Sequence, residues 1–283
     1  MNNFYSSPLQ SIRNIAKTIG TLTLILCSGC MVVDTAVRDS MSNAISSSID
    51  RKVEGWMTGY TDAMFYQLAY TQVFALGGFG TNPNSFEIGE GATWKIESVS
   101  PDEEGGMFTA ERALLSRTDN GDSWWYLKYT PDSQDEEDMF FEYEVLIDKT
   151  MQAREMYVRD YESKDVRHHV FEASDIEEAE INEAALQEDG YSTRPIYLQD
   201  REEYTRDKVF VQLGSGNYDA DLLVYTHEDP DTQESFEYRW WVSENVPGEL
   251  IKFEYGDVTR DNMLRGELVN MQNDYRHRLA SFE

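Results

Sequence analysis

The strongest constraint on this fold is the alternation of apolar and polar residues along most of the chain from residue 92 onward. Successive side chains of a β-strand point to opposite faces, so a period of two predicts strands, and turn-forming residues separate them here. The pattern lacks the strand–helix–strand order of a parallel sheet. We therefore expect about eleven antiparallel strands. Their ranges are 92–99, 107–117, 123–129, 139–148, 152–160, 166–171, 208–214, 220–227, 235–244, 249–255 and 262–270.

Two parts of the chain have the period of a helix instead. Between residues 31 and 76, apolar side chains recur mostly every three or four positions, which predicts long amphipathic helices with a break near Gly55. A capping box at 174–177 and a glycine at 190 predict an acidic helix over 175–189. The predicted fold class is therefore α+β, with one acidic helix between two series of strands. The polar tail after Met271 is expected to fray or to form a short helix.

Aromatic residues are dense on the predicted strands. The order Tyr-Thr, acidic turn, Phe-Glu-Tyr occurs at 129–143 and again at 225–238, which favours a repeated hairpin over chance convergence only slightly. Trp124 and Trp125 are adjacent, as are Trp240 and Trp241, so one indole of each pair points to each face of the sheet. Such a sheet needs either cover on both faces, which segments 35–76 and 175–189 would supply, or an apolar pocket on one face.

The N-terminus has the features of an export signal. Residues 1–29 contain Arg13 and Lys17, no acidic residue, and a mostly apolar run at 19–26 that is too short to span a membrane as a mature helix. Small residues follow, directly before Cys30. This order predicts a secretory signal peptide, and an ordinary cleaved signal or an uncleaved anchor helix are the alternatives to lipidation.

The residues before Cys30 resemble the lipobox of bacterial lipoproteins. By that resemblance, Ser28 and Gly29 precede the cleavage site, and Cys30 becomes the acylated first residue of the mature protein; Cys27 departs from the family, which usually has Leu there. Two or three acyl chains would give stable membrane anchoring. Met31 stands where the family has Asp for retention at the inner membrane, which implies the outer membrane of a diderm bacterium.

The expected organisation is a signal peptide at 1–29, a helical segment at 30–76 and an antiparallel β domain at 77–283 that packs with the helices as one domain. The chain has two cysteines, at 27 and 30, so the mature protein would have no disulfide and no thiol chemistry. Its 53 Asp and Glu residues against 24 Lys and Arg give a net charge of −29. That charge argues against binding to nucleic acid or to anionic lipid head groups.

Motifs for catalysis or metal binding are missing from the sequence. It has no nucleophile elbow, phosphate-binding loop or dinucleotide fingerprint. The four histidines are interpreted as exposed strand and turn residues, and adjacent His168 and His169 face opposite sides of a strand. Acidic turns at 119–122, 132–138 and 228–231 do not match a calcium loop. We expect no metal, no cofactor and no catalytic residue; a hydrolase of envelope polymers remains the enzyme hypothesis.

The number and order of the predicted elements resemble the unclosed half-barrel of the lipoprotein-carrier family, the Lol carriers and their mycobacterial relatives. The resemblance implies a curved sheet that closes over helices and holds acyl chains inside. The leading hypothesis is an outer-membrane lipoprotein, on the periplasmic or surface side, that binds an apolar or lipid-like ligand without chemistry. A structural or assembly partner in an envelope complex is the alternative. The residues expected to line the ligand site are Met64, Phe65, Trp125, Tyr143, Trp240 and Phe253.

Overall fold

The computed structural model describes most of the predicted β domain, at 75–99, 107–131, 141–149, 152–159, 164–171, 201–228, 235–257 and 262–280. The predicted signal peptide, Cys30, nearly all of the helical segment 30–76 and the helix 175–189 lie outside the described residues. Met64 and Phe65 lie outside them as well. Within the described ranges, the helices are the short η1 (Pro83–Ser85) and α6 (Arg201–Tyr204), so this part of the fold is mainly β.

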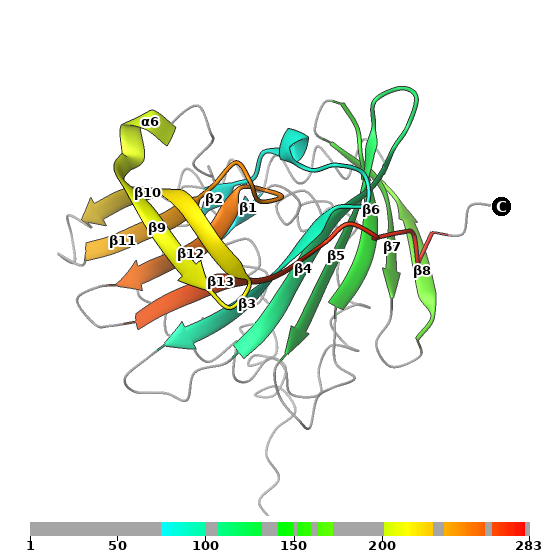
Figure 1. Cartoon of the computed structure of the whole chain (residues 1–283). Helices are drawn as coiled ribbons and strands as arrows, with labels where there is room; N and C mark the ends of the chain where they lie inside the picture. Colours follow the sequence, from blue (N-terminus) through cyan, green and yellow to red (C-terminus); the bar gives the residue numbers. More distant parts are fainter. Residues whose placement is uncertain are drawn as a thin grey trace, which may run out of the picture.

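The main sheet has eleven strands, all antiparallel (Figure 1). Each predicted strand is confirmed, with ends that differ by a few residues. The strands are β3 (Gly91–Val99), β4 (Met107–Arg117), β5 (Ser123–Pro131), β6 (Phe141–Ile147), β7 (Ala153–Arg159), β8 (Val166–Val170), β9 (Thr205–Leu213), β10 (Gly216–Glu228), β11 (Ser235–Val242), β12 (Leu250–Asp257) and β13 (Asn262–Gln272). The largest difference is at β10, which begins at Gly216 because Leu213 pairs with Gly216 across a two-residue turn.

The sheet is built from two meanders that meet at its centre. From β3 the chain steps strand by strand to β8 at one edge, and the second series starts at β9 on the opposite edge and steps back to β13. β13 then pairs with β3, and Leu268 lies opposite Trp94. The sheet curves strongly: Ser215 Oγ, in the turn between β9 and β10, donates to the carbonyl of Leu268 at 2.6 Å, although β10 and β13 are three strands apart.

The proposed sequence repeat corresponds to two real hairpins, β5–β6 and β10–β11. Their registers differ, however. Tyr129 pairs with Phe141, whereas Tyr225 pairs with Tyr238 rather than with Phe236. The two hairpins therefore have similar sequences, but their pairing registers differ by two residues. A shift of two residues keeps the same side chains on the buried face.

Trp124 and Trp125 divide between the two faces of the sheet as predicted. One face, here called the inner face, carries the main core with Trp94, Trp125, Tyr143, Trp240 and Phe253. The opposite, outer face carries a second apolar cluster over β4 and β5: Ala113, Leu115, Trp124, Tyr126 and, from beyond β13, Tyr275. Trp241, by contrast, is half-buried and packs against the main core; it lies opposite Lys252, whose Nζ is 5.0 Å from its ring.

The prediction that the tail frays or forms a helix is wrong. Residues 273–280 run without regular structure over the outer face, and Tyr275, Leu279 and Ala280 are buried. Tyr275 packs on Tyr126, with ring centroids 5.8 Å apart. In the part of the chain that the structure describes, this segment, rather than a helix, covers the second cluster. We call residues 273–280 the strap.

Glu144 anchors the strap. This fully buried carboxylate on β6 accepts hydrogen bonds from His277 Nδ1 (2.9 Å) and from the backbone amides of Arg278 (2.6 Å), Leu279 (2.9 Å) and Ala280 (3.2 Å). Burial disfavours the charged form, but these donors outweigh it and hold the pKa of Glu144 below its ordinary value. The ionised carboxylate therefore fixes the strap across the sheet.

We predict that the contribution of Glu144 to stability depends on pH. Its pKa is lower in the folded protein than its ordinary 4.5, so the contribution is complete above that pH and is lost as pH falls through the folded pKa. Glu144→Gln should lower the free energy of unfolding by about 2 kcal/mol near neutral pH. The difference in the free energy of unfolding between the variant and the native protein should become smaller in acid. Urea denaturation across a pH series measures it.

Glu97→Gln, an exposed change on β3, is the matched control and should leave the unfolding free energy nearly unchanged at each pH. If the loss of unfolding free energy in Glu144→Gln is the same at neutral and at acid pH, the negative charge of Glu144 does not stabilise the strap.

Candidate functional site

A row of aromatic side chains crosses the inner face from the rim inward. Tyr225, Tyr238 and Tyr255 lie opposite one another on β10, β11 and β12. Tyr238 stacks on Tyr255 at 5.3 Å and on Trp240 at 5.5 Å, while Tyr204 of α6 meets Tyr225 edge-on at 5.6 Å. Cross-strand pairing of aromatic residues stabilises a sheet and aligns their rings. Tyr204 and Tyr225 are half-buried and the others are buried, so the row leads from the surface into the core.

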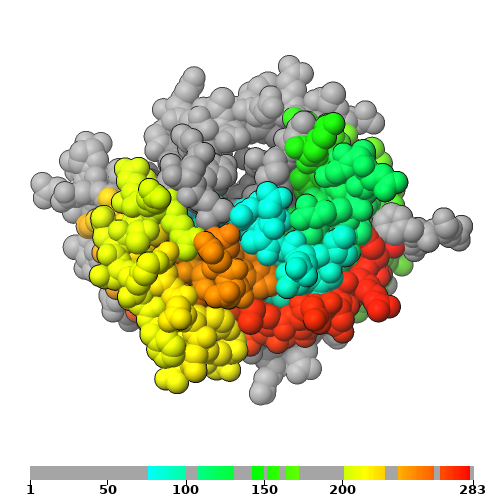
Figure 2. Space-filling model, turned by 45° about the horizontal axis from the view of Figure 1, so that its top comes forward, coloured from blue at the N-terminus to red at the C-terminus, as the bar shows by residue number. Residues whose placement is uncertain are grey.

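A segment just before the sheet lies on the inner end of this row. It contains β1 (Ala75–Leu76), β2 (Phe79–Gly80) and η1, and we call residues 75–86 the cover segment. Trp240 Nε1 donates to the carbonyl of Gly77 at 2.6 Å, and Phe79 packs 6.4 Å from the Trp240 ring. Figure 2 shows the start of the described chain (cyan) between the arm of β9 and β10 (yellow) and the green strands of the first series.

Phe253 lies between two glycines. A Cβ atom at Gly266 of β13 would be 2.1 Å from the Phe253 ring, and one at Gly77 would be 2.3 Å from it. Gly77 also has a φ of +57°, which favours glycine. The ring therefore occupies a slot that exists because side chains are missing on both sides, and it joins the cover segment to the sheet.

The inner face also holds a buried positive charge that the sequence analysis did not single out. Arg112 on β4 is 3% exposed; its Nη1 donates to Thr81 Oγ1 at 2.5 Å, and its guanidinium lies 5.9 Å from the Trp94 ring. Burial lowers the pKa of Arg112, and the nearby hydroxyls of Tyr129 and Tyr143 oppose that shift. The sequence did carry a signal: Arg112 lies at an inward position of the alternation, between Ala110 and Leu114.

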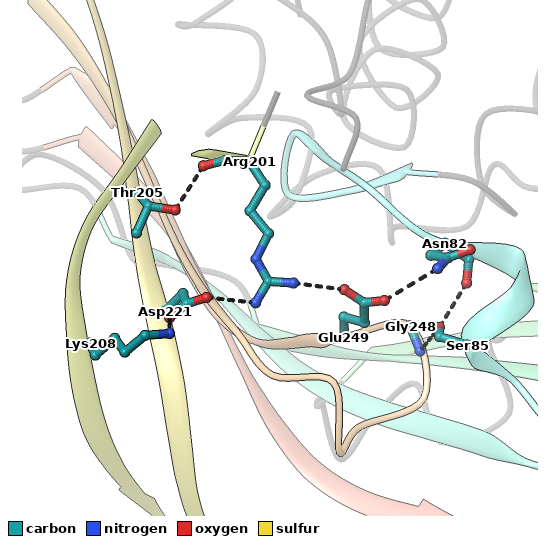
Figure 3. A network of polar contacts seen from close by, with 8 residues as sticks. All are labelled: Asn82, Ser85, Arg201, Thr205, Lys208, Asp221, Gly248 and Glu249. Atoms are coloured by element: carbon teal, nitrogen blue, oxygen red, sulfur yellow. Dashed lines mark hydrogen bonds and ion pairs between the residues drawn. The ribbon is translucent and has the colours of Figure 1, made fainter. Parts of the chain in front are cut away.

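An ion-pair network fixes the cover segment at the rim (Figure 3). Arg201 of α6 donates through Nη2 to Asp221 at 2.9 Å and through Nη1 to Glu249 at 3.2 Å. Glu249 also accepts from Asn82 Nδ2 at 3.3 Å. Hydrogen bonds from Lys208 and Arg201 lower the pKa of Asp221 against a smaller opposing effect of burial. One arginine thus connects α6, β10, the loop before β12 and the cover segment.

The structure places four of the six predicted site residues. Trp125, Tyr143, Trp240 and Phe253 are all buried on the inner face. Trp240 and Phe253 face each other on β11 and β12 beside the cover segment. Trp125 belongs to the other half of the sheet, where Phe86 meets it edge-on at 5.0 Å. Their role as ligand contacts stays a prediction.

The described residues contain no group of three or more His, Cys, Asp or Glu side chains that could hold a metal ion. None of their helices has the length and apolar character needed to cross a bilayer.

Comparison with known proteins finds only distant structural similarity. No family model matches the sequence, and no curated protein matches it. A crystal structure of MucB in complex with MucA(peri) is similar at a TM-score of 0.36 and 9% identity, over 78% of this chain and 59% of that one. An exported protein with a YmcC-like fold from Bacteroides fragilis gives 0.31 and 8% over 66% and 96%. The LolA superfamily protein NE2245 from Nitrosomonas europaea gives 0.24 and 10% over 68% and 88%. This chain spans less than two thirds of the MucB chain.

We predict that Gly266→Ala destabilises the protein. The new methyl group would overlap the buried Phe253 ring, so the ring or the cover segment must move, at a cost of about 1–3 kcal/mol in the free energy of unfolding. Gly214→Ala is the matched control, because a Cβ there meets no atom within 4 Å. Urea denaturation of both variants tests this, and equal stabilities would show that the Phe253 slot imposes no constraint.

Proposed function

We propose that the protein binds an apolar or lipid-like ligand on the inner face of its sheet and performs no chemistry on it there. The observation that carries the proposal is the aromatic row, which runs from half-buried Tyr204 and Tyr225 to buried Tyr238 and Trp240. Ligand sites are mostly apolar and aromatic, with a few polar groups at defined places. A row of rings that starts at the surface offers such a ligand a continuous apolar path.

The cover segment is the element that a ligand would displace. It rests on Trp240 and Phe253 through Phe79 and Gly77, and polar contacts at Thr81 and Asn82 hold it at its sides. A ligand chain entering beside Tyr225 would replace these apolar contacts with its own, at about 25 cal/mol for each Å² it removes from water. Trp240 and Phe253 would then contact the ligand, as proposed from the sequence.

The proposal includes an envelope location. The proposal rests on the sequence of residues 1–30, which has the order of a signal peptide that ends before Cys30. Acylation of Cys30 would anchor the protein to the outer membrane. The net charge of −29 is compatible with this, because the anchor inserts through acyl chains and needs no attraction to anionic head groups.

We predict saturable binding of a dansyl-labelled fatty acid to the full chain, measured by energy transfer from tryptophan to dansyl. Tyr225→Asp places a charge on the apolar path and should weaken binding about tenfold or more. Native mass spectrometry of the gently purified protein should also show a lipid-sized mass that solvent extraction removes.

Phe210→Asp is the matched control, since Phe210 is 67% exposed on edge strand β9 and belongs to the outer side. It should bind the probe like the native protein, and both variants should keep the native thermal unfolding transition. An absence of saturable binding, or equal binding by both variants, would overturn the proposal.

Phe210 also supports the alternative, a structural role in an envelope complex. It is the most exposed large apolar side chain in the described part of the chain, and it lies on a strand at the edge of the sheet. An exposed sheet edge can accept a strand from a partner protein. A protein that carries no ligand and takes up no fatty acid would favour this role.

A further inference from the structure

Three polar side chains form a continuous chain of hydrogen bonds on the outer face, opposite the proposed ligand site. Glu144 Oε2 lies 2.9 Å from His277 Nδ1, and His277 Nε2 lies 3.0 Å from Ser116 Oγ. The contacts join residues 133 and 161 positions apart in the sequence. A hydroxyl, an imidazole and a carboxylate connected in this order are the groups of a nucleophile, its base and the residue that orients the base.

A β-bulge places Ser116 in this arrangement. Leu114 pairs with Trp125 on the inner face, but Ser116 pairs with Trp124 on the outer face, so Leu115 is an extra residue in β4. Without the bulge, regular alternation would point Ser116 inward with Leu114. The bulge therefore turns the hydroxyl to the side where the strap brings His277.

The charge on Glu144 sets the tautomer of His277. The carboxylate is ionised, because three backbone amides of the strap donate to it. A carboxylate can only accept, so His277 Nδ1 carries a proton and, in the neutral imidazole, Nε2 is the acceptor. Nε2 is thus ready to accept the proton of the Ser116 hydroxyl.

The imidazole is held in place yet reachable from solvent. Trp124 packs against it edge-on, with ring centroids 5.7 Å apart. The His277 side chain is 21% exposed, and half-buried Ser116 lies near the end of β4, next to the turn at 118–122.

We propose that Ser116 is a nucleophile for ester hydrolysis, with His277 as its general base and Glu144 as the residue that positions His277. Ser116 Oγ would attack the ester carbonyl carbon while its proton moves to His277 Nε2. The carbon–oxygen bond to the alcohol then breaks, and the alcohol leaves with that proton. Water, deprotonated by the same nitrogen, attacks the acyl-serine and releases the acid and the original hydroxyl.

The surroundings define the class of ester. Ser116 and His277 are only partly exposed beside the strap, so short acyl groups fit the site best. The net charge of −29 repels anions, which favours neutral or cationic esters. This activity is independent of ligand binding on the inner face.

The test is covalent labelling of the full chain with a fluorophosphonate, followed by peptide mass spectrometry, and hydrolysis of p-nitrophenyl acetate. We expect one adduct, on Ser116, and a hydrolysis rate that falls in acid, as general-base catalysis requires. Ser116→Ala should remove the adduct. His277→Gln should slow labelling and hydrolysis about 100-fold. Glu144→Gln should slow them about as much and change the pH profile, which a purely structural role would not do.

His168→Gln is the matched control, because His168 also bonds a carboxylate on this face, with Nε2 2.9 Å from Glu155, but bonds no serine among the described residues. It should label like the native protein. Ser116→Ala keeps the Glu144–His277 contact, so it separates loss of the nucleophile from loss of the strap. Labelling elsewhere, or labelling of His277→Gln at the native rate, would overturn the proposal.

Discussion

The pairing of β3 with β13 is the contact on which the rest of the structure depends. It joins two meanders that would otherwise be separate sheets, each with an additional edge. Trp94 reinforces it: the indole lies opposite Leu268 across the seam, and its Nε1 donates to the carbonyl of Leu250 at 2.9 Å. Because these strands are far apart in sequence, the seam costs much chain entropy to form and needs a large apolar contact to offset it.

Both segments that cover the faces of the sheet continue from this seam. The cover segment leads into β3 and lies on the inner face, and the strap follows β13 and lies on the outer face. The strap bonds the link between the cover segment and β3, since the amide of Tyr275 donates to the carbonyl of Gly89 at 3.0 Å. A single strand pair thus sets the position of the proposed ligand site and that of the proposed nucleophile, on opposite faces.

Periodicity was sufficient to predict the strands because most of them bury one face, and it placed Trp124 and Trp125 on opposite faces correctly. It could not show how the faces are covered. The strap is polar in sequence and was expected to fray, because its anchor, Glu144, is more than a hundred residues away and looks like any other acidic strand residue. His277 was interpreted as exposed for the same reason. Arg112 was overlooked as a strand residue, although its inward position was visible in the alternation.

The outward position of Ser116 could not be predicted from the alternation. Alternation counted from Leu114 places this side chain in the inner core, and only the extra residue Leu115 turns it outward. A bulge leaves no reliable trace in a hydrophobic pattern, because it shifts the faces by one position without changing composition. A search for motifs also fails here, since Ser116, Glu144 and His277 come from β4, β6 and the strap. Their proximity follows from the sheet order and the path of the strap, so any chemistry at this site is a property of the assembled fold.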